Sequence, residues 1–151
     1  MAPHAWSEIV PGLWQGGDGR SPVGEFDHVV SLCPWGEELT PGPSGQTEWF
    51  IADGPMPEPE AQIWEIARDV SARLDRGESV LVRCQMGINR SGLIVAATLL
   101  LRGWSAEEAI DQIRRRRDPF ALSNQHFEGW LRQSGARSDA SSAGRTPPGG
   151  D

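Results

Sequence analysis

Residues 80–92 read Val80-Leu81-Val82-Arg83-Cys84-Gln85-Met86-Gly87-Ile88-Asn89-Arg90-Ser91-Gly92 and carry the strongest structural signal in the chain. They begin with a short apolar run typical of a buried strand, and they lead into a nearly all-apolar stretch typical of a buried helix. The first backbone N–H groups of a helix have no partner within the helix and favour a nearby anion. The segment therefore predicts a strand, an anion-binding loop from Cys84 to Arg90, and a helix.

The residue types in this loop fit one kind of chemistry. A cysteine such as Cys84 becomes a nucleophile as its thiolate, which a helix N-terminus favours. The planar guanidinium of Arg90 matches two oxygens of a phosphoryl group. Gly87 allows a backbone turn that a side chain would hinder, and the Ser91 hydroxyl can donate to the Cys84 sulfur. The loop is suited to attack by a thiolate on phosphorus, which forms a phosphocysteine.

Composition limits the other possibilities. A chain of 151 residues is the size of one domain. Its 14 basic and 21 acidic residues give a net charge of −7, which argues against a general binder of nucleic acid or anionic membranes. Two cysteines, Cys33 and Cys84, are too few for a disulfide scaffold or a four-cysteine zinc site. With no visible signal peptide or membrane-length apolar run, we expect a cytoplasmic protein.

Apolar periodicity and turn residues place the remaining elements. We expect an α/β domain, residues 1–133, with a small central sheet covered by helices. Residues 134–151 hold no large apolar residue, so we expect a disordered tail. The expected strands are 6–14 at an edge, 28–33, 48–52 and 79–83, and the expected helices are 60–76, 91–102, 105–117 and 123–133.

The pattern Cys84-x5-Arg90-Ser91 after a short apolar strand resembles the signature of the cysteine-dependent protein tyrosine phosphatases. Within that superfamily the chain looks most like the small dual-specificity phosphatases. Three further stretches resemble that group: residues 11–16, residues 29–32, and the run Asn124-Gln125-x-Phe127. The resemblance implies a protein tyrosine phosphatase-like α/β fold and a reaction that needs no metal and no other cofactor.

The resemblance also implies roles for individual residues. Cys84 attacks the phosphoryl group, while Arg90 and the loop hold its oxygens. Asp53, 31 residues ahead of Cys84, protonates the leaving oxygen and then activates water. The phosphate-binding residues would be Gln85, Met86, Gly87, Ile88, Asn89 and Arg90. The implied substrate is a phosphorylated protein or peptide, carrying phosphotyrosine and also phosphoserine or phosphothreonine. We expect a monomer that binds neither nucleic acid nor membranes.

Several points stay open at this stage. Arg83 stands where the family usually has histidine, so the reaction's rate and pH profile are in question. Asp53 also fits a plain Asp-Gly turn, with Glu58, Glu60 and Asp27 as rival acids. Cys33 is either a small buried residue or a disulfide partner for Cys84.

Two further segments and the activity itself also have alternatives. The glycine cluster at 16–19 fits a turn better than a second phosphate loop, and the arginine run 114–117 fits a solvated helix face better than a docking patch. Instead of a protein phosphatase, the chain could be a phospho-binding pseudophosphatase, a sulfurtransferase or arsenate reductase, or a phosphatase of lipids or small molecules. The uncharged loop interior, residues 85–89, argues against the lipid enzymes.

Overall fold

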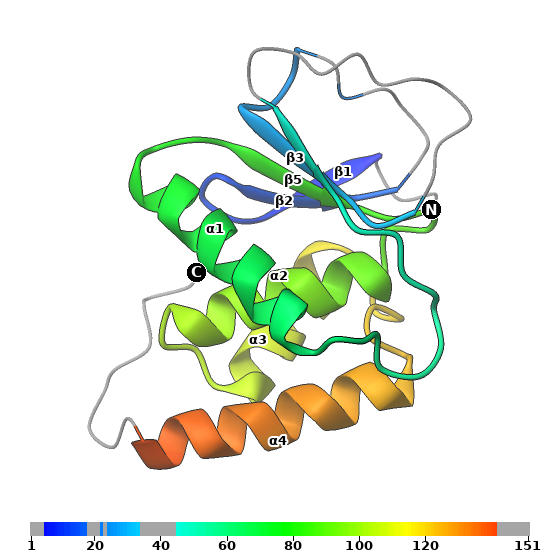
Figure 1. The fold of residues 1–151 in the computed structure, drawn as a ribbon, viewed down its shortest axis with the longest axis vertical. Coiled ribbons are helices and arrows are strands. Elements are labelled where there is room, and N and C mark those ends of the chain that lie inside the picture. The colour runs from blue at the N-terminus through cyan, green and yellow to red at the C-terminus, as the bar shows by residue number, and fades with distance from the viewer. Residues whose placement is uncertain (1–4, 18–21, 23, 34–44, 142–151) are drawn as a thin grey trace.

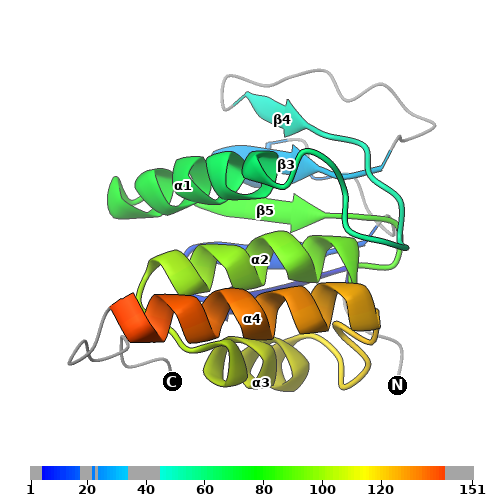
Figure 2. The same ribbon diagram turned by 60° about the horizontal axis from the view of Figure 1, so that its bottom comes forward.

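The computed structural model describes residues 5–17, 22, 24–33 and 45–141, with side chains up to residue 135. Within this part, a five-stranded sheet has the order β1-β2-β5-β3-β4 (Figures 1 and 2). β1 and β2 are antiparallel, and the other neighbours are parallel. The predicted α/β fold is confirmed. The strands are β1 (Trp6–Val10), β2 (Leu13–Gly16), β3 (His28–Ser31), β4 (Gln46–Glu48) and β5 (Val80–Arg83), and the helices are α1 (Ala61–Asp75), α2 (Arg90–Leu101), α3 (Ala106–Arg116) and α4 (Gln125–Ser141).

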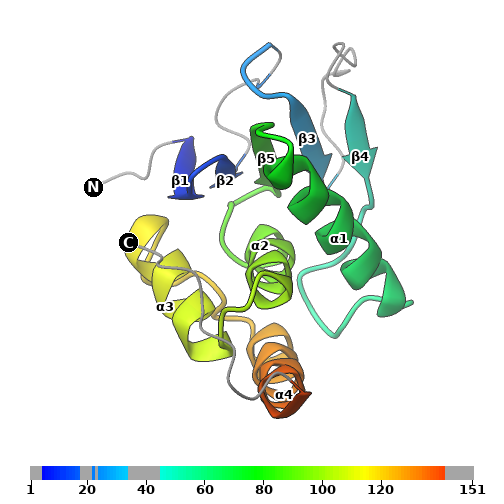
Figure 3. The same ribbon diagram turned by 90° about the vertical axis from the view of Figure 1, so that its left-hand side faces the viewer.

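The main core lies between the sheet and the four helices, which cover the same face (Figure 3). β5 is the central strand and α2 is the central helix. All residues of α2 from Ser91 to Leu100 are buried, as its all-apolar sequence predicts. Because side chains alternate along a strand, Val80 and Val82 join this core, while Leu81 joins a smaller cluster with Phe26 and Val29 on the opposite face.

The helices expected around α1, α2 and α3 are confirmed to within one or two residues at each end. α3 begins with the predicted capping box: the Ser105 hydroxyl accepts from Glu108 N at 3.1 Å, and the Glu108 carboxylate accepts from Ser105 N at 2.9 Å. None of the helices in the described part of the chain is long and apolar enough to cross a membrane.

Two expected strands in the first half of the domain differ from the prediction. The expected edge strand 6–14 is a hairpin that turns at residues 11–12, and its second strand, β2, pairs with β5 inside the sheet. Of the strand expected at 48–52, only Glu48 lies in a strand, because β4 pairs with β3 through Gln46–Glu48. These three polar residues lie at the open edge of the sheet, so their composition gives no apolar signal.

The last helix also differs from the prediction. α4 does not end near residue 133 but continues to Ser141, into the segment expected to be a tail. Gly135 is buried, and a Cβ there would lie 2.8 Å from Cβ of Ala106 on α3. Gly135 lets α4 pack closely on α3 beyond residue 133, a signal that a search for large apolar side chains does not detect. The rest of the expected tail, residues 142–151, lies outside the described residues.

An ion-pair cluster at the end of α1 gives a testable pH dependence. Hydrogen bonds from Arg73 and Arg76, 3.0 Å each, hold the pKa of Glu78 below its ordinary value. A lowered carboxyl pKa stabilises the fold above the unfolded pKa, and this contribution is lost as the pH falls through the folded pKa. We expect Glu78→Gln to be less stable than wild type in urea at pH 7, and we expect the difference to shrink as the pH falls below the ordinary carboxyl range. A pH-independent difference would contradict this.

Candidate active site

The loop between β5 and α2 packs closely against the end of β2. Gly87 has φ +75°, which favours glycine, and a Cβ at this position would lie 2.5 Å from Gly16 C. A Cβ on Gly17 would lie 2.8 Å from the Gln85 carbonyl oxygen. The glycines at 16 and 17 therefore form neither the predicted turn nor a phosphate loop. Gly16 ends β2, and both allow the loop backbone to approach. The rest of that cluster, 18–19, lies outside the described residues.

The Cys84 sulfur lies at the centre of this loop, and its side chain is only 1% exposed. Gly87 N donates to the sulfur at 3.2 Å, and Ser91 N at 3.4 Å. The Ser91 hydroxyl oxygen lies 3.3 Å from the same atom. The two backbone donors come from the loop and the first turn of α2, where N–H groups have no helical partner. The Cys84 sulfur therefore lies within hydrogen-bond distance of two backbone N–H groups and of the Ser91 hydroxyl, and a cysteine acts as a nucleophile in its thiolate form.

Arg90, the first residue of α2, is half-buried and lies at the end of the loop. Its Nη1 donates to the Ile51 carbonyl oxygen at 3.2 Å, which ties the loop to the segment after β4. Of the other predicted phosphate-binding residues, Gly87 and Asn89 are buried, Ile88 is half-buried, and Gln85 and Met86 are exposed. The loop therefore presents backbone N–H groups and one guanidinium, a set of donors suited to a phosphoryl group.

Asp53 is exposed and is held by two asparagines. Asn89 Nδ2 donates to Asp53 Oδ2 at 3.1 Å, and Asn124 Nδ2 donates to Asp53 Oδ1 at 2.8 Å. Asn124 Oδ1 also accepts from the N–H groups of His126 and Phe127, so this residue caps α4. The carboxylate is therefore tied both to the loop, through Asn89, and to the start of α4. This arrangement favours a role at the site over a plain Asp-Gly turn.

The rival acids lie in other surroundings. Asp27 Oδ2 accepts from Ser79 N at 2.8 Å, at the opposite end of β5 from the loop. The Glu60 carboxylate accepts from Trp130 Nε1 at 3.1 Å. Glu58 is exposed. Among these carboxylates, the geometry favours Asp53 as the group that works with the loop.

Two buried side chains hold the loop from behind. Gln15 Nε2, from β2, and Arg117 Nε, from the end of α3, each donate to the Gly87 carbonyl oxygen at 3.0 Å. Arg117 Nη2 also reaches the Met86 carbonyl oxygen at 3.4 Å, and its Nη1 donates to Ser7 Oγ at 3.2 Å. We call Gln15 and Arg117 the carbonyl clamp. Because the clamp holds the Gly87 and Met86 carbonyls behind the loop, the Gly87 N–H can point at the sulfur.

Arg117 also places a positive charge behind the loop. Burial lowers the pKa of Arg117, while attraction from the Cys84 sulfur and the Asp118 carboxylate raises it in part. Arginine stays protonated at neutral pH, so the charge is permanent and favours an anion in the loop. The predicted solvated face of the arginine run is therefore wrong for Arg117, which is 8% exposed, and for Arg114, which is half-buried and donates to the Ala121 and Leu122 carbonyls.

Arg83 precedes Cys84 at the end of β5, and its side chain bonds to the neighbouring strand β3. Arg83 Nε donates to Ser31 Oγ at 3.0 Å, and the two residues are partners across β5 and β3. Alternation along β5 puts Arg83 on the sheet face opposite Cys84, so its positive charge is not directed at the sulfur. Cys33 is buried just after β3, beside β5, and both cysteines are free thiols. Their pairing stays a prediction.

Sequence reasoning missed Gln15, Arg117, Asn89 as a partner of Asp53, and Asn124 as its second partner. The Asn124-Gln125-x-Phe127 run carried only a weak signal for Asn124, because its resemblance to the family implies no role for that residue. Among the described residues, no group of three or more His, Cys, Asp or Glu side chains could hold a metal ion.

Residues 46–137 match the family model described as dual specificity phosphatase, catalytic domain. Human DUSP28 superposes with a TM-score of 0.78 at 20% identity, covering 89% of this chain and 95% of that one. A mouse putative dual specificity phosphatase complexed with zinc tungstate gives 0.79 at 21%, covering 93% and 92%. Tk-PTP in its active form gives 0.72 at 28%, covering 88% and 97%. No curated protein matches the chain.

Proposed function

The chain belongs to the dual specificity phosphatase family, and from that premise we propose that it hydrolyses phosphomonoesters on protein side chains through a phosphocysteine. The substrates are phosphotyrosine and also phosphoserine or phosphothreonine. The observation that carries the proposal is the pair of backbone N–H groups that donate to the Cys84 sulfur at 3.2 and 3.4 Å, with the Ser91 hydroxyl oxygen 3.3 Å from the same atom. The expectation of a cytoplasmic monomer that acts on phosphorylated proteins, and not on nucleic acid or membranes, belongs to the same proposal.

In the first step, the Cys84 thiolate attacks phosphorus, the S–P bond forms, and the bond from phosphorus to the leaving oxygen breaks. Arg90 and the loop N–H groups stabilise the charge on the three other phosphoryl oxygens. Asp53 gives its proton to the leaving oxygen, so the product departs as a neutral alcohol or phenol. The contacts of Asp53 with Asn89 and Asn124 keep its carboxyl beside the loop.

In the second step, water attacks the phosphocysteine, and the Asp53 carboxylate takes the proton of this water. The S–P bond breaks, inorganic phosphate leaves, and the sulfur departs as a thiolate. The Ser91 hydroxyl, 3.3 Å from the sulfur, donates to it as the negative charge develops. Water is the only co-reactant that the two steps consume.

Replacement of Asp53 tests the acid role. We expect Asp53→Asn to lower kcat about 10²-fold with phenyl phosphate, because an amide cannot protonate the leaving oxygen. The loss with para-nitrophenyl phosphate should be smaller, because para-nitrophenol is the stronger acid and leaves more readily as its anion. Steady-state kinetics with both substrates measure the difference.

Glu58→Gln is the matched control, since it removes an exposed carboxylate from the same connection. It should leave both rates within about threefold of wild type, as surface substitutions away from a site usually do. If Asp53→Asn lost the same factor with both substrates, the acid would have to be another group.

A further inference from the structure

Three large apolar side chains are exposed in the described part of the chain: Phe50 (52%), Met86 (67%) and Phe120 (73%). Met86 belongs to the phosphate loop itself. Phe50 precedes Ile51, whose carbonyl accepts from Arg90 at 3.2 Å. Phe120 precedes by two residues Leu122, whose N–H donates to the Ile88 carbonyl at 3.2 Å. We call these three residues the apolar rim, because each lies in the loop or on a segment bonded to it.

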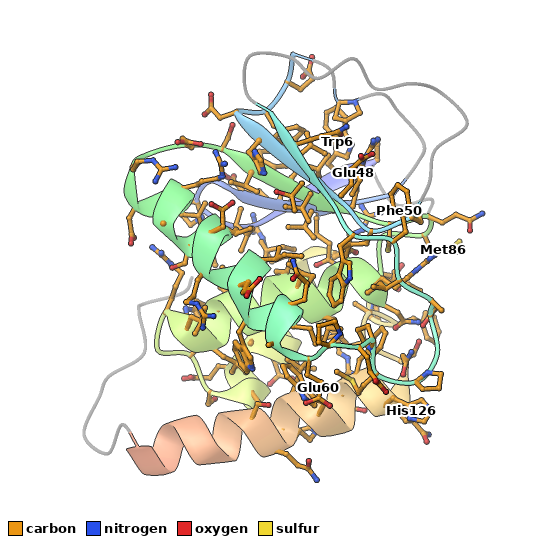
Figure 4. The ribbon with its side chains drawn as sticks, viewed as in Figure 1. Trp6, Glu48, Phe50, Glu60, Met86 and His126 are labelled. Carbon is orange, nitrogen blue, oxygen red and sulfur yellow. The ribbon has the colours of Figure 1, made fainter. Side chains whose placement is uncertain are left out.

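The rim lies close to the phosphate loop in space as well as in sequence. An extended chain advances at most about 3.6 Å per residue, so the Cα atom of Phe120 lies within about 7 Å of that of Leu122. The Cα atom of Phe50 is one residue, about 3.8 Å, from that of Ile51. Figure 4 shows Phe50 and Met86 toward the same end of the molecule, where β5 runs into the loop.

The two phenylalanines lie on segments that come from different edges of the fold. The loop follows the central strand β5, and Phe50 follows β4, which ends the sheet order on one side. Phe120 follows α3, whose last residues reach β1 at the other edge, since Arg116 donates to the Glu8 carbonyl at 3.0 Å. Figure 3 shows α3 on one side of α2 and β4 on the other. Each rim phenylalanine is therefore carried toward the loop from a different edge of the sheet.

Charge disfavours acidic neighbours of the phosphate. The chain has no lysine and a net charge of −7. Near the loop, Arg117 is buried in the carbonyl clamp, and Arg114 donates to the Ala121 and Leu122 carbonyls and to Glu128. Asp53 is itself exposed beside the loop. The site has a guanidinium for one phosphoryl group, and the rim adds exposed apolar surface beside it. The exposed cations Arg115 and Arg116 belong to α3, where Arg116 donates to the Glu8 carbonyl of β1.

We propose that the apolar rim binds the residues on both sides of the phosphorylated one, and that the substrate is an extended segment of protein with apolar side chains within two positions of it. Residues one and two positions away from the phosphorylated one in an extended chain lie about 3 to 7 Å along it. Phe50 and Phe120 precede the residues that are bonded to the loop by one and two positions. Burial of apolar surface drives this recognition. The inference rests on the proposed function and adds the class of substrate.

Two phosphotyrosine peptides that differ only in the flanking positions, leucine in one and serine in the other, test the proposal. We expect wild type to hydrolyse the leucine peptide with a kcat/KM about tenfold higher. Phe50→Ser and Phe120→Ser should each reduce this preference several-fold, and the double variant should abolish it. All of them should hydrolyse para-nitrophenyl phosphate at the wild-type rate, because it has no flanking residues. Phe50→Leu and Phe120→Leu, which keep an apolar surface, should retain the preference.

Equal rates with the two peptides, or faster hydrolysis of a glutamate-flanked peptide, would overturn the rim proposal alone. Faster hydrolysis of phosphatidylinositol phosphate in vesicles than of either peptide would overturn it in favour of a lipid substrate. If wild type failed to hydrolyse para-nitrophenyl phosphate, the proposed function would fail. The rim would then be tested by binding: Cys84→Ser protein should bind the leucine peptide with an about tenfold lower Kd than the serine peptide, and equal Kd values would overturn the rim.

Discussion

Cys84→Ser is expected to lower para-nitrophenyl phosphate hydrolysis by at least about 10⁴-fold. A serine hydroxyl stays protonated near neutral pH, and the donors at 3.2–3.4 Å from the sulfur are arranged for an anion rather than a neutral hydroxyl. The substitution changes one buried atom, so the protein should still fold and bind phosphopeptides. Initial rates, circular dichroism and peptide titration measure activity, folding and binding separately.

Cys33→Ser is the control, because Cys33 is the other buried thiol. It should keep a rate within about threefold of wild type, because Cys33 has no role in either step of the proposed mechanism. Rapid acid quench of wild type during turnover, followed by mass spectrometry, should find the phosphoryl group on the peptide that contains Cys84. Wild-type activity in Cys84→Ser, or phosphate bound to another residue, would rule out the proposed mechanism.

The central part of the site could be predicted because its parts are neighbours in the sequence. Cys84, Gly87, Arg90 and Ser91 belong to one strand, one loop and one helix start, so their relative placement follows from local geometry. Spacing alone brings a cysteine and an arginine to the same helix N-terminus. The order of the strands, which places β5 at the centre, follows from pairing between distant segments and was not predicted.

The carbonyl clamp could not be predicted, because its contacts span long stretches of sequence. Gln15 and Arg117 are 72 and 30 residues from Gly87. In a run of four arginines the sequence does not distinguish the buried member from its exposed neighbours, since that depends on where α3 ends against β1. The side of Arg83, by contrast, follows from alternation alone: a residue next to Cys84 in an extended segment points to the other face.

The placement of Asp53 at the site could be predicted only in part. Its position before Cys84 resembles that of a family acid, but its two partners, Asn89 and Asn124, are 36 and 71 residues away. The loop that brings Asn124 to Asp53 passes through Leu122, a non-glycine residue with φ +60°. Such a conformation is unfavourable for leucine and persists only where surrounding contacts hold it. Propensity would not place leucine there, so the approach of α4 to the site is a consequence of tertiary packing.

Arg117→Met should be the second most damaging change, because it removes the charged half of the carbonyl clamp. The Met86 carbonyl would lose its 3.4 Å contact with the guanidinium, and the Gly87 carbonyl would keep only Gln15. Loss of buried hydrogen bonds to a charged donor should cost roughly 2–3 kcal/mol of stability. The loop N–H groups would no longer be held toward the sulfur, so we expect kcat/KM to fall on the order of 10³-fold.

Arg116→Met is the matched control, one residue earlier in the same run and exposed, with its Nε donating to the Glu8 carbonyl. It should change stability by less than about 1 kcal/mol and leave kcat/KM within about threefold of wild type. Inhibition by inorganic phosphate separates positioning from stability, because it is measured on protein that is still folded. Arg117→Met should bind phosphate at least about tenfold more weakly, since permanent charge and aligned N–H groups are lost together. If Arg117→Met lost stability but kept wild-type affinity for phosphate, the clamp would support the fold without shaping the phosphate loop.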